Sequence, residues 1–113
     1  MNSKTGFVIE EKQESSDAVC LYVTGDLDSH TSSLLKDKMN AGFSNGLKQI
    51  HIVLADVPRM DSSGIATLVE GLRWSKLPEK RFILSGLTDA VYDLFVLSKL
   101  ESEFEILATG AKS

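Results

Sequence analysis

Five short apolar segments rich in β-branched and aromatic residues predict the strands of this chain. They cover residues 7–11, 18–25, 49–55, 81–86 and 104–107. Residues 15–17 are typical of a turn, and Gly25 ends the second segment. The third and fourth segments are compact apolar runs, which suits strands buried at the centre of a sheet.

Apolar residues between these segments recur at helical spacing and predict three helices. The defining positions are Leu35, Met39 and Phe43 in the first helix, Ile65, Leu68, Val69 and Leu72 in the second, and Val91, Leu94, Phe95 and Leu97 in the third. The second helix is expected to run to about Lys76, and Thr88 is a natural N-cap for the third. The resulting order, β-β-α-β-α-β-α-β, predicts an α/β fold in which helices pack on a mixed, partly parallel sheet.

Length and composition indicate an ordinary globular domain. With 113 residues, of which 42% are apolar and 25% charged, the chain is expected to form a single domain over residues 1–113. Its net charge of −4 argues against direct binding to nucleic acid. No apolar run is long enough to span a membrane, and residues 1–16 lack the pattern of a secretory signal. The single cysteine allows no internal disulfide. We therefore expect a cytoplasmic location without membrane insertion.

Candidate catalytic residues are few. Residues 61–65, DSSGI, lack the G-x-S-x-G pattern of a hydrolase nucleophile, and no glycine-rich phosphate loop occurs. His51 falls inside a predicted strand, His30 falls in a polar loop, and Cys20 is expected in the core. The acidic residues show no metal-binding spacing. The sequence thus predicts a protein that is not an enzyme, with no catalytic residues, no cofactor and no metal site.

The stretch MDSSG, residues 60–64, supports two interpretations that the sequence leaves open. In the first, Asp61 or Ser62 only caps the helix that follows. In the second, a serine also carries a phosphate of about −1.5 to −2 charges, which a helix N-terminus tolerates. A partner covering the site would have to bury this charge, at a cost of several kcal/mol. The complex would then break while the domain stays folded.

Two motifs resemble those of the STAS domain family, especially its stand-alone anti-sigma factor antagonists. The first is GDLD at residues 25–28, which fits the family's G-[DE]-[LI]-D signature, and the second is DSSG at residues 61–64, which fits D-S-[SA]-G. The two stand about 35 residues apart, in the family's order. The resemblance extends over about residues 7–108, which we take as the core of a STAS-like domain.

The resemblance implies a function in transcription control. Family members of this type bind an anti-sigma factor, often one that is also a serine kinase, and so release a sigma factor. The kinase phosphorylates a serine of the D-S-[SA]-G loop, which abolishes binding, and a phosphatase reverses the modification. By the family's pattern the acceptor here is Ser63, with Ser62 as the alternative. The chain would be the substrate of the kinase and not a catalyst.

Some positions depart from the family's pattern. The family commonly has V-L-D-L-S before the loop, and here Val53 and Ala55 take the places of its Asp and Ser. Arg59 stands where an apolar or aromatic residue is usual, so its charge either meets a phosphoserine or a negative partner, or is simply solvated. These departures leave a second function open, that of a cytoplasmic accessory subunit of a phospholipid-transporting ABC transporter, which binds the transporter's ATPase.

The residues expected to contact a partner come from two loops. We expect these loops at one edge of the sheet, because the ends of parallel strands gather there. The contact residues are Asp28, Ser29 and His30 in the first loop, and Arg59, Met60, Asp61, Ser62 and Gly64 in the second. Gly64 would let a partner's backbone approach, or would only leave the first helical turn uncrowded. Ser29 is also a candidate N-cap. No apolar patch demands a dimer, so a monomer is expected, with a weak dimer as the alternative.

Overall fold

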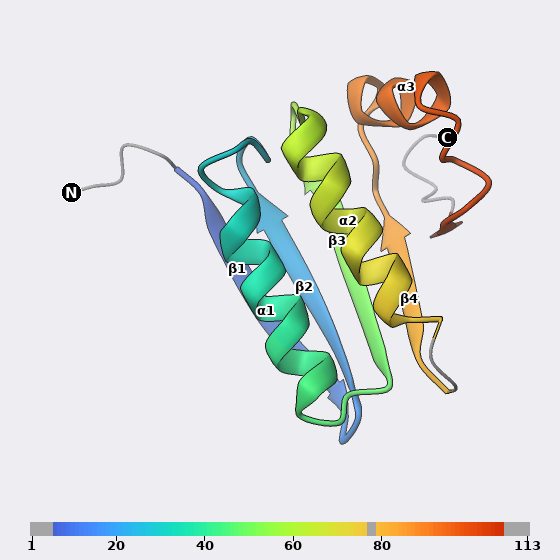
Figure 1. Cartoon of the computed structure of the whole chain (residues 1–113). Helices are drawn as coiled ribbons and strands as arrows, with labels where there is room; N and C mark the ends of the chain where they lie inside the picture. Colours follow the sequence, from blue (N-terminus) through green and yellow to red (C-terminus); the bar gives the residue numbers. More distant parts are fainter. Residues whose placement is uncertain (1–5, 77–78, 108–113) are drawn as a thin grey trace.

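The fold is a five-stranded sheet with three helices, in the order that the sequence predicts. The computed structural model describes residues 6–76 and 79–107 (Figure 1), so the predicted domain limits at 1 and 113, and the core limit at 108, lie outside the described residues. None of the described helices is long and apolar enough to cross a membrane. In chain order the elements are β1 (Val8–Ser15), β2 (Ala18–Thr24), α1 (Ser32–Ser44), β3 (Gln49–Asp56), α2 (Ser62–Trp74), β4 (Arg81–Ser85), α3 (Asp89–Leu97) and β5 (Glu105–Leu107).

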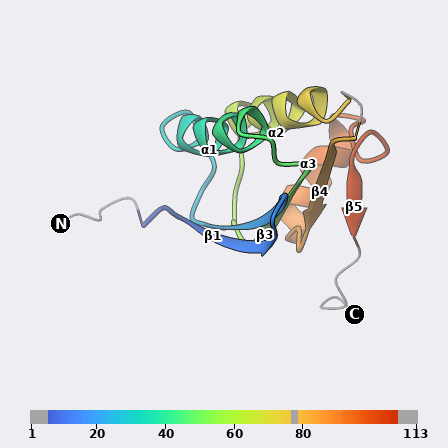
Figure 2. The ribbon, with the colours of Figure 1, turned by 90° about the horizontal axis from the view of Figure 1, so that it is seen from below.

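The strands lie in the sheet in chain order, from β1 to β5. β1 is antiparallel to β2, and all other neighbouring strands are parallel. α1 and α2 connect successive parallel strands and lie on the same face of the sheet (Figure 2). This is expected when crossovers of one hand advance across a sheet in one direction. Because β2 and β3 are parallel, the loops that follow them leave the sheet at the same edge.

The core lies between the sheet and the two helices α1 and α2. Every second residue of the three central strands faces these helices and is buried, namely Val19, Leu21, Val23, Ile50, Ile52, Leu54, Phe82 and Leu84. α1 contributes Leu35, Met39 and Phe43, the three residues predicted from their spacing. The period of two in the strands and of four in α1 therefore places both sets of apolar side chains in one core.

α2 turns small residues toward the core, where the sequence predicted a stripe of large ones. Its buried residues are Gly64, Thr67, Leu68 and Gly71. A Cβ at Gly71 would lie 2.6 Å from Cζ of Phe82, so the helix packs directly on this ring. The remaining positions of the predicted stripe are only half-buried: Ile65, Val69 and Leu72. These three residues pack against the core but are not enclosed in it, because the close approach of α2 to the sheet requires small side chains where the two meet.

β1 is longer than predicted. It runs from Val8 to Ser15, whereas the apolar pattern predicted residues 7–11, and the turn is confined to residues 16 and 17. Most of its residues are exposed, because β1 forms one edge of the sheet. Charged residues are common on edge strands, where they hinder pairing with other chains. Pairing with β2, and not burial, therefore sets the length of β1, and the pairing register skips Glu14.

α3 lies beyond the carboxyl end of β4 and contacts the core through one narrow side (Figure 1). Thr88 caps it as predicted, since its Oγ1 accepts a hydrogen bond from Val91 N–H at 3.3 Å. The buried ring of Phe95 meets that of Phe104 edge-on, with 5.2 Å between centroids. Leu97 was predicted to be buried but is 80% exposed. The prediction was wrong because a residue two positions after Phe95 points to the opposite side of the helix.

This difference within α3 can be measured. Phe95→Ala should lower the free energy of unfolding by about 3–5 kcal/mol, because it opens a cavity in the core. Leu97→Ala removes a side chain that is already in water and should change this free energy by less than about 0.5 kcal/mol. Urea unfolding of both variants checks the pair. A loss for Leu97→Ala as large as that for Phe95→Ala would show that α3 is rotated from the orientation described.

Candidate functional site

Two loops at the carboxyl edge of the sheet are joined by backbone hydrogen bonds. The first loop follows β2 and the second follows β3. Leu27 N–H donates to the carbonyl oxygen of Arg59 at 3.0 Å, and Asp61 N–H donates to the carbonyl oxygen of Leu27 at 3.1 Å. Leu27 and Met60 also form an isolated parallel bridge. The two segments singled out in the sequence therefore lie side by side, as predicted from the parallel sheet.

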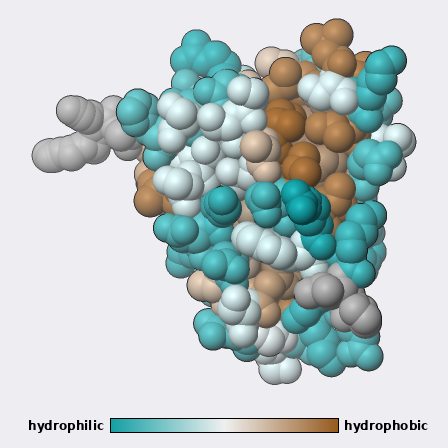
Figure 3. Space-filling model, viewed as in Figure 1, coloured by the Kyte–Doolittle hydropathy of each residue, from teal (hydrophilic) through white to brown (hydrophobic). Residues whose placement is uncertain are grey.

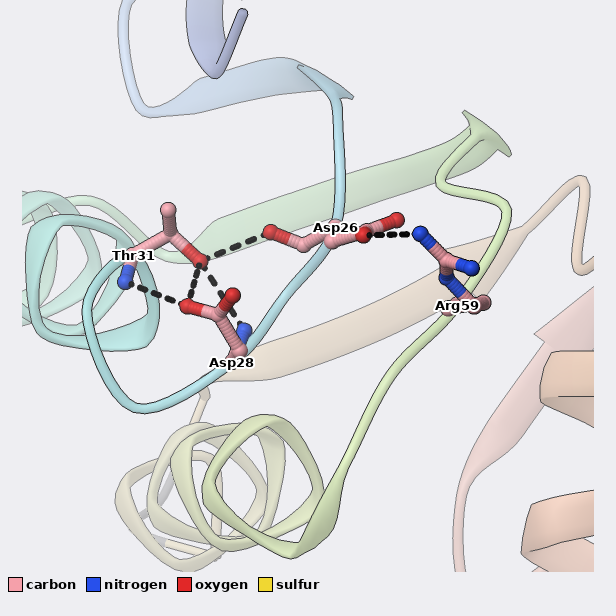
Figure 4. A network of polar contacts seen from close by, with 4 residues as sticks. All are labelled: Asp26, Asp28, Thr31 and Arg59. Carbon is pink, nitrogen blue, oxygen red and sulfur yellow. Dashed lines mark hydrogen bonds and ion pairs between the residues drawn. The ribbon is translucent and has the colours of Figure 1, made fainter. Parts of the chain in front are cut away.

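Asp28 and Thr31 hold the first loop in shape (Figure 4). Oδ1 of Asp28 accepts hydrogen bonds from the backbone N–H groups of His30 at 2.9 Å and of Thr31 at 3.1 Å. The Thr31 hydroxyl donates to the carbonyl oxygen of Asp26 at 2.7 Å and accepts from Asp28 N–H at 2.9 Å. The bond from His30 N–H, followed by that from Thr31 N–H, lowers the pKa of Asp28, because both favour its charged form.

Ser29 does not cap α1. The N-cap position is Thr31, and the backbone of this turn is bound by Asp28, whose carbonyl oxygen accepts from Ser32 N–H at 2.9 Å. Ser29 and His30 are exposed in the turn. The prediction was wrong because the Asp28 carboxylate already accepts from the N–H groups that a serine cap would have taken.

Arg59 forms an ion pair with Asp26 across the two loops (Figure 4). Its Nη2 donates to Oδ2 of Asp26 at 2.9 Å. This hydrogen bond and the negative charge of Asp26 raise the pKa of Arg59. The Arg59 side chain is 79% exposed, so water screens the pair and limits its contribution to stability. A guanidinium has five N–H donors, so Arg59 can meet an anion while it keeps its bond to Asp26.

The two serines open α2, directly after its N-cap. Oδ1 of Asp61 accepts hydrogen bonds from Ser63 N–H at 2.8 Å and from Gly64 N–H at 3.3 Å. Of the two predicted candidates, Asp61 and not Ser62 is therefore the cap. Ser62 is exposed and Ser63 is half-buried, so neither residue is enclosed in the interior. The end of a helix at which they lie carries a partial positive charge.

Gly64 is buried against the chain's own first loop. A Cβ at this position would lie 2.5 Å from Cγ of Met60 and 2.9 Å from the carbonyl oxygen of Leu27. The hypothesis that Gly64 admits a partner's backbone is wrong on this side of the helix, because Leu27 and Met60 fill the space. A glycine is required at position 64 because the two loops pack closely there. Met60 itself is half-buried.

Sequence reasoning missed two residues that shape this edge, Asp26 and Thr31. Asp26 belongs to the GDLD motif at residues 25–28, so the motif identified its position. The hydrogen bond between Asp26 and Arg59 was not predicted. Thr31 carried no signal beyond being a hydroxyl residue near a helix start. A third loop reaches the same edge, where the Thr88 hydroxyl donates to the carbonyl oxygen of Val57 at 3.3 Å.

The residues considered as catalytic candidates, His30, His51 and Cys20, form no catalytic group with the two serines in the described part of the chain. Among the described residues, 6–76 and 79–107, no hydrogen bond links the hydroxyl of Ser62 or Ser63 to a histidine. His51 lies on β3, where its Nε2 is 2.7 Å from Oγ of Ser85. Cys20 is only 1% exposed, and burial raises the pKa of its thiol. A buried thiol that holds its proton is a poor nucleophile. This edge of the sheet therefore presents two serines, one exposed and one half-buried, as the candidate site.

Comparisons with known proteins agree with this fold. A family model described as "STAS domain" matches residues 10–112. The anti-sigma-B factor antagonist of Listeria monocytogenes is 26% identical over 98 residues, which are 87% of this chain and 86% of the relative. The structure of the anti-sigma factor antagonist SpoIIAA in its unphosphorylated form superposes with a TM-score of 0.79 at 20% identity, covering 90% of this chain and 88% of SpoIIAA. The phosphorylated form of SpoIIAA, a Bacillus cell fate determinant, gives a TM-score of 0.73 at 19% identity, covering 90% and 91%.

The capping role of Asp61 predicts a stability difference. Asp61→Ala should lower the free energy of unfolding by about 0.5–2 kcal/mol, because two N–H groups of α2 lose their acceptor. Asp61→Asn retains a side-chain oxygen at the same position and should keep most of this free energy. Chemical denaturation of the two variants at neutral pH checks the prediction. Equal losses for Ala and Asn would contradict the hydrogen-bonding role of the side chain.

The lowered pKa of Asp28 predicts a dependence on pH. Its ionised form is stabilised only in the folded protein, so this stabilisation is complete above the ordinary pKa of 3.8 and is lost as the pH falls through the lower value in the folded state. Asp28→Asn should therefore destabilise the protein at neutral pH, and the difference from wild type should shrink on acidification. Urea midpoints measured from about pH 7 to about pH 2 test this. A difference that stays constant with pH would contradict it.

Proposed function

The chain belongs to the STAS domain family, and we propose that it is an anti-sigma factor antagonist. In this proposal it binds an anti-sigma factor that is also a serine kinase, and so releases a sigma factor for transcription. The observation that carries the proposal is the position of Ser62 and Ser63, which are accessible at the start of α2 where the two loops meet. The relatives named as anti-sigma factor antagonists support this function over that of a transporter subunit.

The fold can tolerate a phosphate at the start of α2. The helix dipole favours negative charge at this end by about 0.3–2 kcal/mol. Asp61 already takes the N–H groups of Ser63 and Gly64, so the cap does not depend on either serine hydroxyl. Modification of a serine here removes no hydrogen bond that the structure assigns to the cap. The folded domain should therefore keep nearly all of its stability.

The same phosphate should oppose binding of a partner. Asp26, Asp28 and Asp61 lie in the two joined loops, with Arg59 as the positive charge that pairs with one of them. A phosphate adds about −1.5 to −2 charges to this acidic edge. A partner that covers the edge has to desolvate the phosphate, at a cost of several kcal/mol. A cost of about 4 kcal/mol already corresponds to nearly a thousandfold loss of affinity.

Apolar surface suited to a protein partner adjoins the modified loop. It lies over α3 and along the neighbouring side of α2 (Figure 3). The apolar side chains that these helices leave half-buried or exposed include Ile65, Val69, Leu72, Tyr92, Leu94, Val96 and Leu97. Contiguous apolar surface on a small domain marks sites of protein interaction. It favours a macromolecular partner over a small ligand for this edge.

We assign the phosphate to Ser63, with Ser62 as the alternative acceptor. Both residues lie in the first turn of α2, and a relative of the same fold is known in a phosphorylated form. The kinase supplies the ATP, and a phosphatase restores the active form. We place the interaction in the cytoplasm and expect the chain to act as a monomer, without binding nucleic acid. The proposed contact residues are Asp28, Ser29, His30, Arg59, Met60, Asp61 and Ser62.

Substitution of Ser63 tests the switch. Ser63→Asp should leave the thermal midpoint nearly unchanged and weaken binding to the cognate kinase at least about a hundredfold, since it places a permanent charge under the partner. Ser63→Ala should bind as wild type does and take up no phosphate. Isothermal titration, calorimetric unfolding and a kinase assay measure the three properties. Unchanged affinity of Ser63→Asp would overturn the switch.

Ser62 provides the matched control for this experiment. If Ser63 is the acceptor, Ser62→Ala should still be phosphorylated, and loss of phosphate in this variant alone would move the site to Ser62.

The partner itself can be identified by capture of tagged wild-type protein and of Ser63→Asp from the native cell. The proposal is supported if wild type recovers an ATPase of histidine-kinase type and Ser63→Asp does not. Recovery of a membrane transporter's ATPase would contradict it.

A further inference from the structure

α1 and α2 cover one face of the sheet (Figure 2), and the side chains between the core-facing positions of β2 and β3 lie on the other face. Cys20 on β2 and His51 on β3 are neighbours in the parallel register. Glu14 belongs to the adjacent edge strand, at the point where the register with β2 is interrupted. Such interruptions redirect a side chain and are often found beside functional sites. Three successive strands thus each contribute one side chain to this group.

These three side chains offer convergent ligand atoms. A carboxylate oxygen of Glu14, Sγ of Cys20 and a ring nitrogen of His51 all lie within 4.8 Å of one another. In a tetrahedral zinc site with bonds of about 2.0–2.3 Å, ligand atoms are roughly 3.3–3.8 Å apart. Side-chain rotations that bring each pair of atoms closer by at most about 1.0–1.5 Å therefore place all three in range. Thiolate, imidazole and carboxylate are the ligands that zinc prefers.

We propose that Glu14, Cys20 and His51 bind a zinc ion on the face of the sheet opposite α1 and α2. Three protein ligands leave a fourth position for water. On binding, the Cys20 S–H bond breaks, a zinc–sulfur bond forms, and the proton passes to solvent. Glu14 is exposed, so the ion can enter from this side, while Cys20 is buried and holds its ligand atom in a fixed place. This site is separate from the loops of the proposed switch.

Ser85 supplies the outer contact that a ligating histidine requires. Nε2 of His51 lies 2.7 Å from Oγ of Ser85, and Ser85 is itself only 8% exposed. In the proposed site, Nε2–H donates to this hydroxyl and Nδ1 binds the metal. A ligating histidine usually donates its second N–H in this way, which fixes its tautomer and ring orientation. Ser85 is therefore a positioning residue for the proposed ligand.

Zinc titration of the full, tag-free chain tests the site. The protein is treated with a chelator and a reductant, exchanged into clean buffer, and titrated with zinc chloride in a calorimeter. Wild type should bind one ion. Cys20→Ser and His51→Gln should weaken binding more than a hundredfold, and Ser85→Ala about ten- to a hundredfold, as is usual for outer contacts. Glu14→Gln should also weaken zinc binding. The matched control variants, Glu10→Gln and His30→Gln, should bind zinc as wild type does.

Cobalt gives a second readout that reports on the thiolate directly. The cobalt complex of wild type should show a near-ultraviolet sulfur-to-metal charge-transfer band, and Cys20→Ser should lack it. Circular dichroism of each metal-free variant shows whether it is folded, and Cys20→Ala replaces Cys20→Ser if the buried hydroxyl prevents folding. Absence of saturable zinc binding by wild type overturns the proposal. So does unchanged affinity in folded Cys20 and His51 variants.

Discussion

The arrangement of the carboxyl edge depends on the backbone of Leu27. Its N–H and carbonyl groups bind the loop before α2, and its side chain is fully buried. A buried peptide group needs hydrogen-bond partners, so the two loops can be buried against each other only in this register. Gly64 completes the constraint, because a larger residue there would collide with the Leu27 carbonyl oxygen. The start of α2 is thereby fixed relative to the turn at Asp28 by backbone geometry and close packing.

The contacts that stabilise the two loops are made by residues other than the two serines. Asp61 caps α2, Asp28 and Thr31 shape the neighbouring turn, and Leu27 joins the two loops. Within the described ranges, no hydrogen bond is made by the hydroxyl of Ser62 or Ser63. A group that holds nothing in place can change its charge without unfolding the domain. That separation meets one requirement of the proposed switch, namely a small effect of the added charge on the folded monomer.

Much of this fold could be predicted from the sequence, because period and order are local properties. The spacing of Leu35, Met39 and Phe43 identified the buried side of α1, and alternating strands and helices implied loops at a common edge. What depends on the distance between elements could not be predicted. Gly71 is buried because α2 lies close to Phe82, and Leu97 is exposed because only the side of α3 that carries Phe95 meets the core. The Arg59–Asp26 pair likewise follows from how two loops meet.

The cluster of Glu14, Cys20 and His51 shows the same limit most clearly. Their separations along the chain match no metal-binding motif, and the sequence predicted no site. They converge because β2 and β3 are parallel and in register, and because β1 skips one position beside them. α1 and α2 cover one face of the sheet (Figure 2), and the three side chains lie on the other. Residues on that face are free to serve a second chemistry, since the core and the loop edge are both built without them.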